Sequence, residues 1–151
     1  LDLPVIQHEL MHVIQTLILG ALDESLLYSW FAEGIAIEIS DDVFYEFIDS
    51  QQQLDDLTAT FGMLNPISLQ YSWTYPDIEN VALFYYYPMF RLAVRYLMDP
   101  DGQGGSFYDV RDVLIDVADG VEFSTSLEDR FGISLIEYED QFFDLMYDYL
   151  P

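Results

Sequence analysis

Residues 8–12 read His-Glu-Leu-Met-His, the pattern H-E-x-x-H. Side chains four residues apart on a helix lie on one face, so His8 and His12 can offer two imidazole nitrogens to one metal ion. Glu9 stands beside that pair, where a carboxylate can hold and deprotonate a water on the metal. The spacing therefore predicts a helix at residues 8–12 that carries part of a catalytic metal site.

A catalytic zinc site needs a third protein ligand and an open position for water. The best candidate is Glu33, which lies in Trp30-Phe31-Ala32-Glu33-Gly34-Ile35-Ala36. A carboxylate in so apolar a segment is costly to bury unless a cation lies beside it. We therefore predict that Zn²⁺ is held by His8, His12 and Glu33. The alternatives are ordinary polar positions for the two histidines and an exposed helix position for Glu33.

The two segments His8–Gln15 and Trp30–Ala36 together resemble the gluzincin metallopeptidases. These are zinc peptidases with an H-E-x-x-H helix and a glutamate ligand on the next helix, and W-x-x-E-G-x-A is common in their peptidase MA-like branch. A looser resemblance extends to Tyr87–Asp101 and Phe131–Glu137. The resemblance implies a zincin-like helical subdomain, the C-terminal catalytic portion of such an enzyme. The β-sheet subdomain that usually precedes it would be absent, reduced or upstream, so we expect a fragment or a processed product.

Such enzymes often place a tyrosine opposite the zinc as a donor to the tetrahedral oxyanion. The resemblance assigns this role to Tyr87, with Tyr86 next. Adjacent side chains point in different directions, so at most one of the three tyrosines at 85–87 can serve, and all three could instead be core or surface aromatics. Some relatives orient a zinc histidine with a carboxylate four residues after the glutamate ligand. Ile37 occupies that position here, which leaves three substitutes: Glu38, Asp41 and Asp42.

The charge of the chain restricts its partners. Twenty-eight acidic residues stand against four arginines and no lysine, for a formal net charge of −24. Such a surface repels nucleic acid and anionic lipid and favours cationic substrates, divalent cations or high salt. The absence of cysteine excludes disulfides and thiolate ligands, and is compatible with either side of a membrane. No apolar run is long enough to span a bilayer. An extracellular or cell-surface location is our expectation, and the oligomeric state is open.

Hydrophobic spacing indicates a single, mainly α domain over residues 1–151, with about six helices, because almost no stretch alternates with period two. In the first helix the apolar stripe is expected to be buried, and Gly34 is expected to let the first two helices approach closely. Asp41 or Asp42 would cap the third helix. The aromatic segment 66–77 would pack over the core or line the substrate cleft, and Asp99–Gly105 would be a turn rather than a calcium loop. The expected helices cover residues 4–20, 28–40, 43–61, part of 77–98, 106–118, 126–131 and 134–149.

The predicted function is zinc-dependent hydrolysis of peptide bonds in a peptide or protein substrate, with Glu9 as the base that activates water. One alternative is a catalytically inactive zincin-like binding module with a structural or vestigial metal site, whose acidic surface would bind a basic partner. The other is a helical interaction domain without metal. The intact Glu9 argues against both, because a purely structural site has no need of it.

Overall fold

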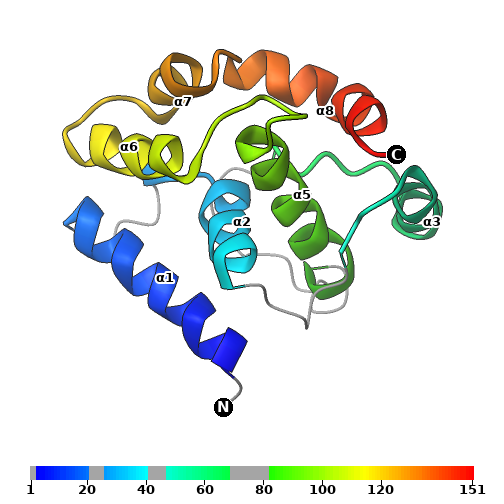
Figure 1. Ribbon diagram of the computed structural model, residues 1–151, viewed down its shortest axis with the longest axis horizontal. Helices are drawn as coiled ribbons and strands as arrows, with labels where there is room; N and C mark the ends of the chain where they lie inside the picture. The colour runs from blue at the N-terminus through cyan, green and yellow to red at the C-terminus, as the bar shows by residue number, and fades with distance from the viewer. Residues whose placement is uncertain (1–2, 21–25, 41–46, 69–81) are drawn as a thin grey trace.

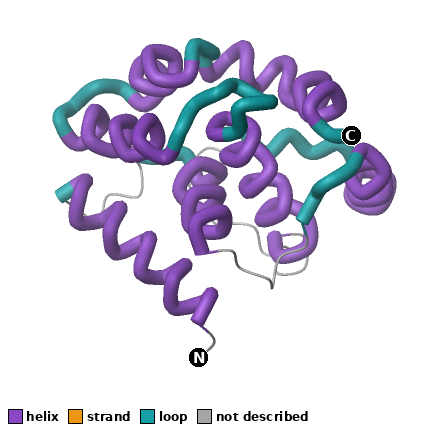
Figure 2. The backbone as a smooth tube through the Cα atoms, viewed as in Figure 1, coloured by secondary structure: helices purple, strands orange, loops and turns teal. Residues whose placement is uncertain are grey.

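The computed structural model describes residues 3–20, 26–40, 47–68 and 82–151. Within these ranges the chain is helical and contains no strand, which confirms the mainly α prediction (Figure 2). One π-helical segment, η2, covers Ala82–Tyr86 and runs directly into α5. The α-helices are α1 (Leu3–Leu19), α2 (Ser29–Ser40), α3 (Gln51–Phe61), α5 (Tyr87–Met98), α6 (Phe107–Ala118), α7 (Phe123–Phe131) and α8 (Leu135–Tyr149).

Several helix ends follow directly from local sequence. Ser106 and Asp109 form a complete capping box at the start of α6, and the Ser134 side chain accepts from the Glu137 amide at the start of α8. Gly132 ends α7 in the left-handed region at φ 70°, which favours glycine. Pro88 lies in the first turn of α5, directly after the π-helical segment η2.

The third helix starts later than predicted. Its N-cap is Ser50, whose side chain accepts from the Gln53 amide, and Phe47–Asp49 are not helical. Ile48 is buried all the same, so its burial does not depend on a helix. Asp41 and Asp42, the predicted caps, lie outside the described residues.

Helix α2 is the centre of the arrangement, with α1 on one side and α5 on the other (Figure 1). Its close approach is to α5 rather than to α1, which corrects the expectation for Gly34. A Cβ on Gly34 would collide with the backbone carbonyl of Phe90 and would stand 2.6 Å from Cγ2 of Val94. Only glycine therefore allows α2 and α5 to pack at this distance.

The prediction for the buried face of α1 is wrong. The side chains expected inside are all at least 40% exposed: Ile6, Leu10, Val13, Ile14 and Leu17. The buried side chains are instead His8, Met11 and Gln15, which face α2. The side of the helix that carries the histidines is the one that packs, and its apolar side is exposed.

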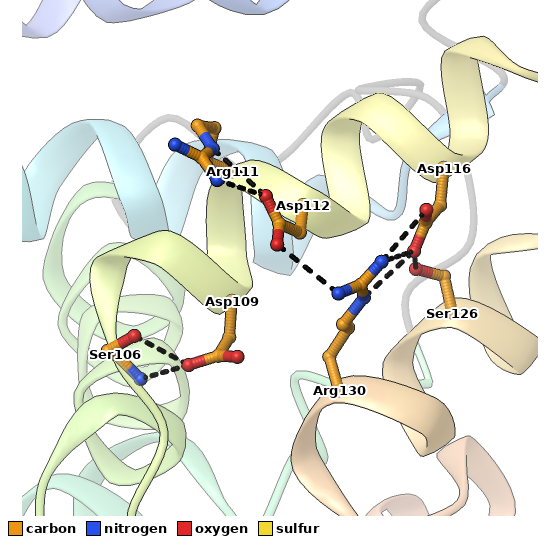
Figure 3. A network of polar contacts seen from close by, with 7 residues as sticks. All are labelled: Ser106, Asp109, Arg111, Asp112, Asp116, Ser126 and Arg130. Carbon is orange, nitrogen blue, oxygen red and sulfur yellow. Dashed lines mark hydrogen bonds and ion pairs between the residues drawn. The ribbon is translucent and has the colours of Figure 1, made fainter.

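Helices α6, α7 and α8 cover one end of α2 and α5 (Figure 1). An ion-pair network joins α6 to α7 (Figure 3). Arg130 of α7 donates to Asp116 and Asp112 of α6, at 3.0 Å from Nε to Asp116 Oδ2 and 3.2 Å from Nη1 to Asp112 Oδ2. Ser126 Oγ donates to the same Asp116 oxygen at 2.8 Å. The network links α7 to α6 near the surface of the protein.

The segment Asp99–Gly105 is a turn between α5 and α6, as predicted. The Asp99 carbonyl accepts from the amides of Gly102 and Gly104, and its carboxylate accepts from the Asp101 amide and the Tyr149 hydroxyl. The Asp99 carboxylate is therefore engaged in hydrogen bonds at this turn.

Among the described residues, no helix is both long enough and apolar enough to cross a membrane. The aromatic segment predicted at 66–77 lies mostly outside the described residues.

Candidate metal centre

The three predicted ligands come together between α1 and α2. Nε2 of His12 lies 3.1 Å from Nε2 of His8, and Oε2 of Glu33 lies 3.4 Å from each of these nitrogens. Among the described residues, His8, His12 and Glu33 form a group whose donor atoms could hold one metal ion. The structure thus brings the three predicted residues together, and their role as metal ligands stays a prediction.

The size of this triangle matches zinc. Donor atoms about 2.0–2.1 Å from a tetrahedral zinc stand roughly 3.3–3.4 Å apart. The edges of 3.1, 3.4 and 3.4 Å are close to that separation without any movement of the helices. Three ligands from the protein leave one tetrahedral position for water or substrate, as catalytic zinc sites require.

The surroundings of Glu33 differ from those of an ordinary surface ion pair. Its side chain is 14% exposed, and Oε2 is buried without a hydrogen bond of good geometry to any described residue. Two ring nitrogens and one carboxylate oxygen point at the same small volume. A single cation at that point would interact favourably with all three atoms at once.

Electrostatics couple the charges of the group. The adjacent Glu33 carboxylate raises the pKa of His12 to about 9, although burial opposes this shift. Burial alone would raise the pKa of Glu33, but the two histidines outweigh it, so the pKa lies below its ordinary value. In the absence of a metal, the site therefore favours a protonated His12 beside a charged Glu33.

The predicted base, Glu9, is exposed on the solvent side of the pair. Successive helix residues are about 100° apart, so Glu9 flanks the ligands on α1 rather than pointing at α2. Its negative charge is near enough to contribute to the raised pKa of His12. The His12 side chain is 29% exposed and that of His8 is 9% exposed, so solvent reaches the group from the side of His12.

Of the three adjacent tyrosines, Tyr85 has a structural role, and the structure assigns no role to Tyr86 and Tyr87. Tyr85 is fully buried, and its hydroxyl both donates to the Leu64 carbonyl and accepts from the Leu64 amide. Tyr86 and Tyr87 are half-buried, and both rings contact Phe90. These ring contacts do not bear on the oxyanion role, which stays a prediction for Tyr87 and Tyr86.

Among the described residues, the group that contacts Nδ1 of His12 is an amide and not the predicted Glu38. Glu38 instead accepts from Nε of the buried Arg91 at 2.7 Å, and Asp41 and Asp42 lie outside the described residues. Gln15, which sequence reasoning missed, lies 3.0 Å from Nδ1 of His12 through its Oε1. A polar residue three positions after the second histidine, on the same helix face, was the available signal.

The chain matches no protein-family model, and comparisons with curated proteins and with solved structures find no match either. The resemblance to gluzincins therefore stays a prediction from the sequence motifs.

Proposed function

We propose that this chain is a zinc-dependent metallopeptidase of the gluzincin type, in which His8, His12 and Glu33 hold the metal. The observation that carries the proposal is the convergence of Nε2, Nε2 and Oε2 within 3.4 Å of one another. A structural site could use the same ligands, but it would need neither an accessible side nor a flanking carboxylate. Both are present here, at His12 and at Glu9.

When bound, zinc would supply Lewis-acid polarisation of the scissile carbonyl and lower the pKa of the attacking water. The chain's own residues would do the rest. Glu9 would take the proton from that water as it attacks and deliver it to the leaving amine. Tyr87, with Tyr86 as the alternative, would donate a hydrogen bond to the oxyanion.

The proposed substrate is a peptide or protein, and basic sequences are favoured. The formal charge of −24 creates a negative potential that draws cations and cationic peptides toward the surface. The same potential raises the local concentration of divalent metal ions.

The proposal is tested by metal content and hydrolysis together. Elemental analysis should give one zinc per chain for the wild-type protein and for Glu9→Gln, and clearly less for Glu33→Gln. Hydrolysis of a fluorescently labelled casein should fall by about 10²- to 10⁴-fold in Glu9→Gln, because the proton acceptor is lost while the ligands remain. Glu128→Gln, an exposed change on α7, is the matched control and should behave as the wild type.

The outcomes separate the alternatives. Bound zinc with no hydrolysis by the wild type, over a range of casein and basic peptide substrates, would favour the inactive binding module. No zinc bound even after zinc is added would refute the metal site and the peptidase with it.

A further inference from the structure

The amide of Gln15 connects the two helices that carry the ligands. Gln15 is 5% exposed, and its Nε2 donates to the backbone carbonyl of Ala32 at 2.8 Å. Ala32 directly precedes Glu33 on α2. One side chain of α1 therefore binds the backbone of α2 at the residue directly before the carboxylate ligand Glu33.

This bond fixes which way the amide of Gln15 points. A carbonyl oxygen only accepts, so the atom facing Ala32 must be the amide nitrogen. The amide oxygen then faces His12, with Oε1 lying 3.0 Å from Nδ1. An amide oxygen also only accepts, so Nδ1 of His12 must carry the proton in this bond.

The consequence falls on the other nitrogen of the same ring. In a neutral imidazole one nitrogen carries the proton and the other has a free lone pair. With the proton held on Nδ1, the lone pair is on Nε2, the atom that lies 3.1 Å from His8 Nε2 and 3.4 Å from Glu33 Oε2. That is the tautomer in which His12 can bind a metal through the atom that faces the other two ligands.

We propose that Gln15 is a positioning residue, which uses the Ala32 carbonyl as a fixed reference to hold His12 in the metal-binding tautomer and orientation. The proposal rests on the metal site of the proposed function but not on its hydrolytic chemistry. A neutral amide does here what a carboxylate does in many metal sites, and it adds no further negative charge to the group.

Two substitutions at this position separate hydrogen bonding from packing. Gln15→Met keeps the length and apolar volume but removes the acceptor, whereas Gln15→Glu keeps an acceptor oxygen opposite Nδ1. Gln7→Met makes the same chemical change at an exposed position of α1 and is the matched control. Circular dichroism would first verify that each variant is folded.

The measurement is the zinc dissociation constant, from competition with a chelating dye. Gln15→Met should weaken zinc binding by about 10- to 100-fold, the usual effect of removing a partner that orients a ligand. Gln15→Glu should bind more tightly than Gln15→Met, and Gln7→Met should match the wild type. Wild-type affinity in Gln15→Met would show that the hydrogen bonds of Gln15 do not affect zinc binding and would overturn the proposal.

A second readout needs neither a variant nor a bound metal. In the metal-free wild type, at a pH where spectra show the His12 ring to be neutral, ¹⁵N spectra should place its proton on Nδ1, opposite the amide oxygen of Gln15. A proton on Nε2 would overturn the role of Gln15. If the proton is on Nδ1 but the wild type binds no zinc, the positioning role stands and the proposed function fails.

Discussion

Oε2 of Glu33 lies 3.4 Å from Nε2 of His12, and this distance makes the stability of the metal-free protein depend on pH. The pKa of His12 is raised from 6.5 to about 9, so its contribution is complete below pH 6.5 and is lost as the pH rises through 9. The pKa of Glu33 is lowered from 4.5, so its contribution is complete above pH 4.5 and is lost as the pH falls through the folded value. The pair thus stabilises most between pH 4.5 and 6.5.

The check is a series of thermal melts in a metal chelator. The melting temperature of the wild type should fall from pH 6.5 to 9, and the fall should be smaller in Glu33→Gln, where the neutral amide no longer favours a charged His12. Equal slopes in the two proteins would mean that Glu33 does not control the titration of His12.

The contact of Gly34 with α5 predicts a costly substitution. A methyl group at this position would meet the Phe90 carbonyl and the Val94 side chain, neither of which can move freely in a packed helix pair. Gly34→Ala should therefore lower the free energy of unfolding by about 1–3 kcal/mol, the usual cost of overpacking. Urea denaturation would measure it.

The same substitution should also weaken zinc binding, because Glu33 is its neighbour on α2 and moves with the helix. Gly120→Ala is the comparison: it adds a methyl group into open space, and its cost comes from a φ of 90° alone. That variant should lose stability but keep the zinc affinity of the wild type. Unchanged zinc affinity in both variants would show that the distance between α2 and α5 does not affect the metal site.

The two faces of α1 can be compared with adjacent residues. Leu10 is 53% exposed and Met11 is 5% exposed. Leu10→Gln should change the free energy of unfolding by no more than about 0.5 kcal/mol, as is usual at the surface. Met11→Gln should cost at least about 2 kcal/mol, because it removes apolar packing and buries an amide. A larger loss in the Leu10 variant would restore the face first predicted from the sequence.

The charge balance predicts a strong effect of salt. Each of the four arginines already pairs with a carboxylate, as in Arg91 with Glu38 and Arg95 with Asp49. Most of the 28 acidic residues therefore repel one another without compensation. The Debye screening length shortens from about 10 Å at 0.1 M salt to about 3 Å at 1 M. The melting temperature should rise over that range in sodium chloride; a fall would mean that the arginine pairs outweigh the repulsion.

The parts of the fold that the sequence predicted are those decided by nearby residues. The capping box of Ser106, the stop at Gly132 and the four-residue spacing of His8 and His12 are all local, and all agree with the structure. The position of Glu33 beside the two histidines was predictable as well, because a carboxylate in an apolar helix is costly to bury unless a positive charge lies nearby.

The errors arose at positions where the burial or the helix boundary is set by contacts with residues distant in the sequence. Apolar periodicity marks a stripe on α1 but does not tell which element covers it, and α2 packs on the other side. The apolar residues before Gln51 continue a helical pattern, yet Ser50 offers a cap that begins α3 later. Gln15 escaped notice because a neutral amide gives no charge signal, and its role depends on a carbonyl of another helix.

Few side chains of α1 are fully buried, so the ligand group is a substantial part of what attaches this helix to the rest of the protein. Of its three buried side chains, His8 and Gln15 belong to that group, and only Met11 is an ordinary apolar contact. Local opening free energies differ among elements, and a bound ligand raises only those of the openings that would release it. Backbone amides of α1 should therefore exchange with deuterium faster than those of α5 when zinc is withheld, and should become protected when it is added. The metal would then act as a clasp that sets how often the first helix detaches, in addition to any chemistry it performs.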